Sequence, residues 1–418
     1  MQSFADELNQ RLATLRQQGL YRELRRVDSA PGPQIEIGGR TFLNFSSNDY
    51  LGLANHPTLK AAAIKAVEKF GAGAGASRLI CGSLAPFHEL EEALAAFKKT
   101  EAALTFSTGY AAALGTITAL MGKGDVIILD KLVHACIVDA AKLSGAKLRI
   151  FDHNDLNDLE DKLRWSSSFS LSGNTLKREL QPRRTLIVTE SIFSMDGDTV
   201  PLREIVALKE KYGAWLMVDE AHATGILGQN GRGLADELGV SQHVEIQMGT
   251  LGKALGASGG FICGSRALID FLVNRARSFI FSTAPVPAAA AAARAGIEIV
   301  QSTEGEARRE SLRANIQQCR TGVAPVSKLK EDGDRRDACP TLGAIIPLIL
   351  GDESQAVAAA AQLREQNIFV PAIRYPTVAR GAARLRITLT AAHNSQDIAT
   401  LVHALGDLKS EISSLKSA

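Results

Sequence analysis

Ala214-Trp215-Leu216-Met217-Val218-Asp219-Glu220-Ala221-His222 is a short apolar run that ends in acids and a histidine. Further along the chain, a second apolar run leads into Gly249-Thr250-Leu251-Gly252-Lys253-Ala254-Leu255-Gly256. Short apolar runs of this kind are typical of strands that are buried on both faces of a parallel sheet. Ligands of an open parallel sheet bind outside the carboxyl ends of its strands. We therefore expect Asp219, His222 and Lys253 to share one site.

The other strand candidates also end in polar, chemically able side chains. These candidates are residues 103–106 before Gly109 and Tyr110, 126–129 before His134, 185–188 before Glu190 and Ser194, and 245–247 before Thr250. Because parallel strands end at the same edge of a sheet, the pattern predicts a single site that contains all of these residues.

A lysine, an acid and a histidine in this arrangement are what a pyridoxal-phosphate (PLP) site needs. Lys253 taken alone, in a Gly-rich loop, is typical of a solvated surface residue. Together with Asp219 and His222, it is predicted to form a Schiff base with PLP and to act as the proton-transferring base. Asp219 is expected to keep the ring nitrogen protonated, and His222 to face the phenolic oxygen. His134 is expected to lie flat on the ring, although a packed histidine is an equally common interpretation.

A phosphate site is predicted where Gly109 and Tyr110 begin an Ala-rich helical stretch. A turn of small residues at a helix N-terminus presents free N–H groups and a positive dipole end, which suit a phosphate. The hydroxyl of Thr250 is expected to contact the same phosphate. Ser194 completes the predicted cofactor-binding set, although it and Glu190 are expected to shape a loop rather than to do chemistry.

Strand and helix patterns alternate over most of the chain, which predicts an α/β fold with a mostly parallel sheet covered by helices. Residues 1–57 are expected to form a helix (1–27) and a hairpin, 58–290 the large PLP-binding domain, and 291–418 a smaller α+β domain. The Ser/Arg-rich stretch 165–184 is interpreted as a surface loop.

Composition excludes several classes of protein. The 418 residues carry a formal charge of +2, with acidic and basic residues interspersed, which argues against a nucleic-acid surface. The five cysteines are scattered without a C-x-x-C pair, so we expect reduced thiols, no metal site and a cytoplasmic protein. An acidic N-terminus and the lack of a long apolar run predict neither a signal peptide nor a membrane span.

Two rival motifs fail on context. Residues 71–76, Gly-Ala-Gly-Ala-Gly-Ala, match a dinucleotide fingerprint as a string but follow a helix-like segment instead of a strand. A nicotinamide-dependent oxidoreductase is therefore a remote alternative. Gly252-Lys253-Ala254 lacks the glycine spacing and the hydroxyl residue of a P-loop.

With these residues the chain resembles the α-oxoamine synthases, PLP enzymes of the fold-type I (aspartate aminotransferase-like) superfamily. The landmarks are Asn44-Phe45-Ser46-Ser47-Asn48-Asp49-Tyr50-Leu51-Gly52-Leu53, residues 71–78, His134-Ala135, residues 194–198, residues 218–225 and residues 250–256. The resemblance covers nearly the whole length. It implies an acyltransferase that condenses an amino acid with an acyl thioester and releases carbon dioxide.

Four stretches resemble the branch of the family that acts in biotin biosynthesis. They are the first landmark (residues 44–53), Leu20-Tyr21-Arg22, and the stretches around residues 372–378 and 383–386. That resemblance implies L-alanine and either pimeloyl-CoA or pimeloyl acyl carrier protein as substrates. It places Arg22 and Thr377 near the acyl group, and Arg386 and Asn48 at the amino-acid carboxylate, with His134 beside the substrate. Glycine with acetyl-CoA, as in glycine C-acetyltransferase, is the alternative.

The resemblance also implies a homodimer, with residues 281–283 contacting the partner's phosphate. Cys136 and Glu220 depart from the residues of many relatives, and we expect neither to touch a predicted role.

Overall fold

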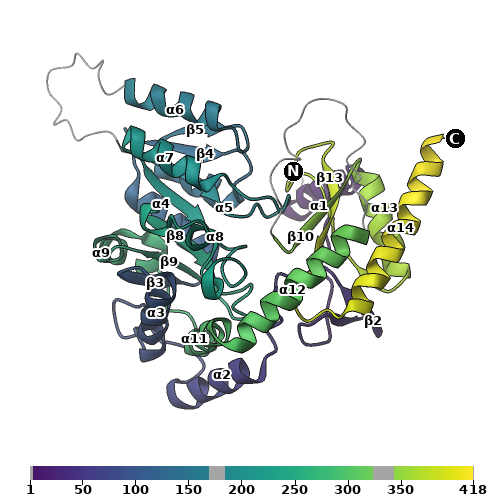
Figure 1. Ribbon diagram of the computed structural model, residues 1–418, viewed down its shortest axis with the longest axis horizontal. Coiled ribbons are helices and arrows are strands. Elements are labelled where there is room, and N and C mark those ends of the chain that lie inside the picture. Colours follow the sequence, from purple (N-terminus) through teal and green to yellow (C-terminus); the bar gives the residue numbers. More distant parts are fainter. Residues whose placement is uncertain (1–2, 169–183, 323–342, 418) are drawn as a thin grey trace.

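The structure, a computed structural model, describes residues 3–168, 184–322 and 343–417. It contains a larger body built on one sheet and a smaller body around β10 and β13, and helix α12 (Thr303–Gly322) runs from one to the other (Figure 1). The prediction of an α/β fold with a mostly parallel, helix-covered sheet and a smaller α+β unit is confirmed.

The large sheet has seven strands in the order β3-β9-β8-β7-β6-β4-β5. Its strands are β3 (Ala102–Phe106), β4 (Val126–Asp130), β5 (Lys147–Phe151), β6 (Thr185–Glu190), β7 (Trp215–Asp219), β8 (Ile246–Thr250) and β9 (Gly260–Gly264). From β8 to β5 the pairing is parallel, whereas β9 is antiparallel to both of its neighbours. All residues of β4 and β9 are buried, as expected for strands covered on both faces.

Alternate residues of the central strands face two separate apolar cores. In β4, Ile128 belongs to the core that contains Leu94 of α3, whereas Ile127 belongs to the core that contains Ile137 of α5. The helices of this body are α2 (Pro57–Phe70), α3 (Ala85–Lys98), α4 (Gly109–Leu120), α5 (Ala135–Ser144), α6 (Leu156–Ser168), α7 (Leu202–Tyr212), α8 (Leu234–Glu237), α9 (Arg266–Arg275), α10 (Arg277–Ile280) and α11 (Pro287–Gln301). None of the helices in the described ranges is long and apolar enough to cross a membrane.

The smaller body holds two three-stranded sheets, β1-β2-β11 and β10-β13-β12. Its elements are β1 (Gln34–Ile37), β2 (Arg40–Asn44), β10 (Ile345–Gly351), α13 (Glu353–Glu365), β11 (Ile368–Phe369), β12 (Ala372–Ile373), β13 (Ala383–Thr388) and α14 (Ser395–Ser417). Because β11 pairs in parallel with β2, segments from the two ends of the chain form one sheet. The predicted division at 290/291 falls within α11, which packs against α2 and α3, and the domain limits stay a prediction.

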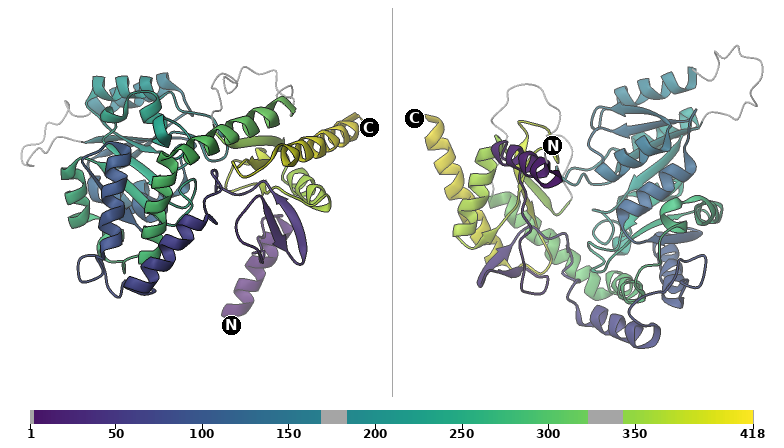
Figure 2. Two further views of the ribbon diagram at one scale, coloured as in Figure 1. Left: turned by 60° about the horizontal axis from the view of Figure 1, so that its bottom comes forward. Right: turned by 180° about the vertical axis from the view of Figure 1, so that it is seen from behind.

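Several local expectations differ from the structure. Helix α1 (Phe4–Gln17) is shorter than the predicted 1–27, because Gly19 turns the chain with a φ of +67°. This helix projects from the smaller body, as the left view of Figure 2 shows, and none of its residues is buried. Strand β9 and helix α12 are elements that the sequence patterns did not predict. The predicted loop 165–184 begins inside α6, and its residues 169–183 lie outside the described ranges.

A buried ion pair joins α3 to the end of β7. The Lys98 ammonium donates to the Glu220 carboxylate and to the Arg232 carbonyl, and both charged side chains are almost fully buried. Glu220 also accepts a hydrogen bond from the Ala235 N–H at 2.8 Å. The expectation that Glu220 touches no predicted role stays a prediction, and the pair anchors the segment that carries His222.

Replacing Lys98 by Met should lower the free energy of unfolding by about 3–5 kcal/mol, because it leaves the Glu220 carboxylate buried without a cation. The measurement is the urea midpoint, at an unchanged slope. The matched control is Lys99→Met, which removes an exposed ammonium 3.7 Å from Asp236 and should cost less than about 1 kcal/mol. Equal midpoints for the two variants would contradict the importance of the buried pair.

Candidate active site

Lys253 lies in the loop between β8 and β9, with its amine facing a histidine. Lys253 Nζ is 2.9 Å from His222 Nε2. Burial lowers the pKa of Lys253, although the carboxylates of Asp219 and Glu190 oppose this effect. A lowered pKa increases the fraction of neutral amine, which is the nucleophilic form that a Schiff base requires.

The glycines of this loop allow close packing of the backbone, in addition to the predicted access of a ligand to the Lys253 amine. Gly256 has a φ of +67°, and a Cβ atom on it would lie 2.6 Å from the carbonyl carbon of Leu53. The absence of a side chain therefore lets Leu53 and Ala54 pack directly against the Lys253 loop.

Two carboxyl groups lie side by side at the ends of β6 and β7. Asp219 is the register partner of Glu190, and its Oδ1 accepts a hydrogen bond from the Ala221 N–H at 2.9 Å. Glu190 Oε1 accepts the His134 N–H at 2.5 Å. Burial raises the pKa of both acids, and in Glu190 the Asp219 charge raises it further, whereas the Lys253 ammonium opposes the shift in both. Parallel pairing thus brings His134, Asp219 and Lys253 to the same end of the sheet.

Free backbone donors lie at the start of α4. Thr108 caps this helix through the Ala111 N–H at 3.0 Å, whereas the N–H groups of Gly109 and Tyr110 have no acceptor within the part of the chain that the structure describes. Thr250 lies beside Gly109, and its hydroxyl donates to the Gly259 carbonyl at 3.0 Å. The donors that sequence reasoning assigned to a phosphate are therefore close together.

Arg386, on β13 of the smaller body, faces the same region. Its Nε donates to the Ser194 carbonyl at 2.6 Å, one Nη to the Thr388 hydroxyl at 2.9 Å and the other to Asn48 Oδ1 at 3.2 Å. Arg386 is buried, yet no carboxylate of the described residues forms an ion pair with it. A buried guanidinium without an acid is suited to bind a carboxylate ligand. Ser194 contributes its carbonyl here, a contact with the arginine that sequence reasoning did not predict.

Arg22 and Thr377 are brought together from opposite ends of the chain. An Nη of Arg22 lies 3.5 Å from the Thr377 hydroxyl, and both side chains are exposed. Arg374 fixes the approach of this segment by donating to the carbonyls of Gly19 and Tyr21. None of the described contacts links Arg22 or Thr377 directly to Lys253.

Sequence reasoning missed two features of the site. Tyr50 lies 2.5 Å from His222 Nδ1, although the chain gives no local signal for a contact across 172 residues. Cys136 Sγ lies 3.0 Å from His134 Nδ1, so the expectation that Cys136 touches no predicted role is wrong. Among the described residues, no group of histidine, cysteine and acidic side chains is arranged to hold a metal ion.

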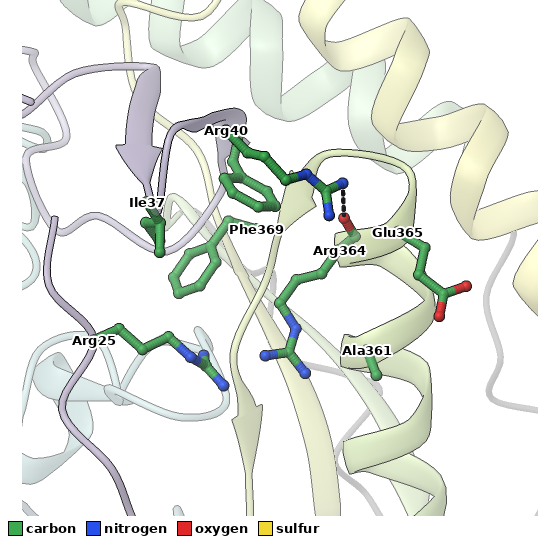
Figure 3. Close-up of a pocket in the computed structure, with 8 residues that line it drawn as sticks. Arg25, Ile37, Arg40, Ala361, Arg364, Glu365 and Phe369 are labelled. Carbon is green, nitrogen blue, oxygen red and sulfur yellow. Dashed lines mark hydrogen bonds between the residues drawn. The ribbon is translucent and has the colours of Figure 1, made fainter. Parts of the chain in front are cut away.

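A separate recess of about 290 Å³ lies on the smaller body, between the hairpin, α13 and β11 (Figure 3). It is lined by Arg25, Ile37, Arg40, Phe42, Ala361, Arg364, Glu365 and Phe369. None of these residues belongs to the predicted site, so this recess and the reactive groups do not coincide.

Known proteins with similar sequences identify the family. A sequence model of the family described as aminotransferase class I and II matches residues 40–405. The 8-amino-7-oxononanoate synthase of Geobacter sulfurreducens is 45% identical over 413 residues, which are 98% of this chain and 98% of that protein. The chain belongs to the 8-amino-7-oxononanoate synthase family. It is a PLP-dependent acyltransferase of fold type I.

Solved structures agree on fold and cofactor. Serine palmitoyltransferase from S. paucimobilis, with bound PLP-myriocin aldimine, has a TM-score of 0.86 at 29% identity and covers 98% of both chains. The 8-amino-7-oxononanoate synthase from Francisella tularensis has a TM-score of 0.71 at 28% identity, covering 90% of this chain and 99% of that one. Backbone similarity favours the first structure, but shape alone does not carry substrate choice. The 45% sequence identity places the chain in the 8-amino-7-oxononanoate synthase family.

The residues present fit PLP. A buried amine with a lowered pKa, a carboxyl at a neighbouring strand end and two free N–H groups at a helix N-terminus are complementary to its aldehyde, ring nitrogen and phosphate. The nicotinamide alternative has no such support, because residues 71–76 follow helix α2.

His153, which sequence reasoning gave no role, holds the loop that carries Ser194. Its Nδ1 lies 2.9 Å from Asp130 and its Nε2 lies 2.7 Å from Asp198. Burial disfavours the charged ring, but the hydrogen bonds to the two carboxylates outweigh it and raise the pKa of His153 to about 10. Because this pKa is above the ordinary value of about 6.5, the contact stabilises the fold fully below that pH and is lost as the pH rises through about 10.

His153→Gln should therefore lower the melting temperature most at about pH 6.5 and reduce the pH dependence between about 6.5 and 10. Differential scanning calorimetry across this range provides the measurement. His243→Gln, which removes an exposed histidine beside Glu210, is the control and should preserve the wild-type pH profile. A profile of His153→Gln parallel to the wild type would exclude the charged contact.

Proposed function

We propose that this enzyme joins L-alanine to a pimeloyl thioester and releases carbon dioxide, the free thiol and 8-amino-7-oxononanoate for biotin biosynthesis. The observation that carries the proposal is buried Arg386, a guanidinium at the site of Lys253 that forms no ion pair with an acid of the described residues. L-Alanine supplies the carboxylate that this guanidinium lacks. The identity to 8-amino-7-oxononanoate synthases supports the choice of substrates.

PLP, when bound, supplies an electron sink for the charge that develops on the amino-acid α-carbon. Lys253 is the base that takes the α-proton and later returns one, since its amine is buried and its pKa is lowered. Arg386 and Asn48 hold the alanine carboxylate. The new bond joins the alanine α-carbon to the thioester carbonyl carbon, the thiolate leaves, and the carboxylate carbon departs as carbon dioxide.

We assign supporting roles to the remaining groups. Asp219 would hold the ring nitrogen in its protonated form, and His222 would donate to the phenolic oxygen. His134 would stack on the ring, where its backbone bond to Glu190 fixes it. The phosphate would bind the N–H groups of Gly109 and Tyr110 together with Thr250.

Arg22 and Thr377 favour a pimeloyl group over an acetyl group. A pimeloyl chain ends in a free carboxylate, which suits a guanidinium, whereas acetyl-CoA offers no such group. Arg22 has a hydroxyl neighbour, and no acid of the described residues forms an ion pair with it. This difference argues against glycine C-acetyltransferase.

The test is product formation by the purified holoenzyme with L-alanine or glycine, each combined with pimeloyl-CoA, pimeloyl carrier protein or acetyl-CoA. We expect 8-amino-7-oxononanoate and carbon dioxide from L-alanine with a pimeloyl donor. Lys253→Ala should abolish turnover and borohydride-dependent covalent attachment of the cofactor while it still binds PLP non-covalently. Preference for glycine with acetyl-CoA would refute the proposed substrates, and covalent attachment in the variant would refute the role of Lys253.

We also propose that the enzyme is a homodimer. Three large apolar side chains of two neighbouring segments are exposed: Leu79 at 49%, Ile80 at 77% and Phe281 at 71%. The bridge between Ser77 and Thr283 places their two segments side by side. Such a cluster is typical of a surface that another chain covers. Residues 281–283 would then reach the partner's phosphate site.

Phe281→Glu should shift the dimer toward monomer, because it places a charge within the apolar contact, and sedimentation velocity at micromolar concentration would show it. Phe271→Glu, on α9, changes a phenylalanine of 41% exposure away from this cluster and should preserve the dimer. A wild-type protein that stays monomeric at all concentrations would refute the dimer.

The cytoplasmic location is also a proposal. Cys136, Cys263 and Cys319 are buried free thiols. Unpaired buried thiols agree with a reducing compartment.

A further inference from the structure

Tyr50 connects the predicted carboxylate site to Lys253 through buried hydrogen bonds. Its hydroxyl lies 2.5 Å from His222 Nδ1 and 3.2 Å from Asn48 Oδ1. His222 Nε2 faces Lys253 Nζ at 2.9 Å, and Asn48 Oδ1 accepts from Arg386 at 3.2 Å. One chain of contacts thus runs from Arg386 of the smaller body to Lys253 of the larger body.

The backbone holds Tyr50 rigidly in this position. The side chain is 1% exposed, and the Tyr50 carbonyl accepts the Ala391 N–H at 2.8 Å. Asp49 closes the following turn by accepting the N–H groups of Leu53 and Ala54 at 2.8 and 3.0 Å. The hydroxyl therefore has few alternative orientations.

We assign the single hydroxyl proton of Tyr50 to the shorter of its two contacts, which are 2.5 Å to His222 Nδ1 and 3.2 Å to Asn48 Oδ1. The Tyr50 hydroxyl has one proton, and burial raises the pKa of Tyr50 to about 12, so that proton stays in place at neutral pH. Asn48 Oδ1 already accepts from Arg386, whereas His222 Nδ1 is the nearer acceptor. Burial and the Lys253 charge lower the pKa of His222, which therefore carries a single ring proton. With Nδ1 as acceptor, that proton is on Nε2.

We propose that Tyr50 is a positioning residue whose hydroxyl fixes His222 with its proton on Nε2, directed toward Lys253. This inference rests on the proposed function for its role in the reaction. An Nε2–H cannot accept a hydrogen bond from an ammonium, so it favours the neutral Lys253 amine. The same N–H is available to donate to the phenolic oxygen of the cofactor.

Other charged groups also act on these residues and must be held constant in a test. The pKa of Lys253 also responds to the charges of Asp219, Glu190, Arg386 and Cys136. The pKa of His222 responds to Arg386 and His134, and that of Tyr50 to Arg386 and Glu190. Tyr50→Phe keeps all of these charged groups and the buried ring, but it also removes the hydrogen bond between Arg386 and the Tyr50 hydroxyl. Tyr212→Phe is the matched control, because it removes a hydroxyl bonded to Glu160 at 2.9 Å on another side of the large body.

The first measurement uses wild-type apoenzyme labelled with ¹⁵N-histidine, with the His222 signal assigned from a His222→Gln variant. We expect its Nδ1 to resonate as an unprotonated nitrogen and its Nε2 as a protonated one. The reverse assignment would overturn the proposal without the need for a Tyr50 variant.

The second measurement is the pH dependence of Lys253 acylation in the apoenzyme. In Tyr50→Phe, His222 is free to accept from the ammonium, so the midpoint should move to higher pH, whereas Tyr212→Phe should match the wild type.

In the holoenzyme, kcat should fall about tenfold, the loss expected for one buried hydrogen bond, with little change in KM for alanine. An unchanged midpoint and tautomer in a folded Tyr50→Phe would refute the proposal. The apoenzyme results stand even if the proposed substrates are wrong, so the two failures are distinguishable.

Discussion

The parallel pairing of β6, β7 and β8 is the constraint on which the rest of the site depends. It forces Glu190 and Asp219 into register at one edge of the sheet and brings the Lys253 loop to the same edge. Buried charges of opposite sign then set each other's protonation, because little water is present to screen them. Burial at this edge lowers the pKa of Lys253 and raises the pKa values of the two acids, and the attraction between the opposite charges opposes these shifts.

In the proposed function, the larger body supplies the reactive groups and the smaller body orients the substrate. Arg386 reaches the site from β13, and the segment that carries Asn48 and Tyr50 follows the hairpin of the smaller body. In the proposed mechanism, the chain from Arg386 through Tyr50 to Lys253 links carboxylate recognition to the protonation state of the Lys253 amine. This link gives the short motif around Tyr50 a physical task beyond packing.

Sequence patterns predicted the strands with Asp219, His222 and Lys253 because each depends on local apolar runs and on a general rule about strand ends. They missed β9, whose ends are the glycines Gly260 and Gly264, and which is recognised only by its antiparallel partners. They gave His153 no role, because Asp130 and Asp198 lie 23 and 45 residues away and become neighbours only through the fold. The same reason hid the contact between Tyr50 and His222.

The sequence by itself determined the fold class, the cofactor and the strand ends that carry the chemistry, since these follow from periodicity and residue type. Only the tertiary structure decided which groups share protons and which carboxylates stay buried together. It also showed that Arg386 is buried and that, in the described ranges, no acid forms an ion pair with it. Hydrogen bonds and pKa values depend on distances of a few ångströms between residues far apart in the chain, and no local pattern encodes those distances.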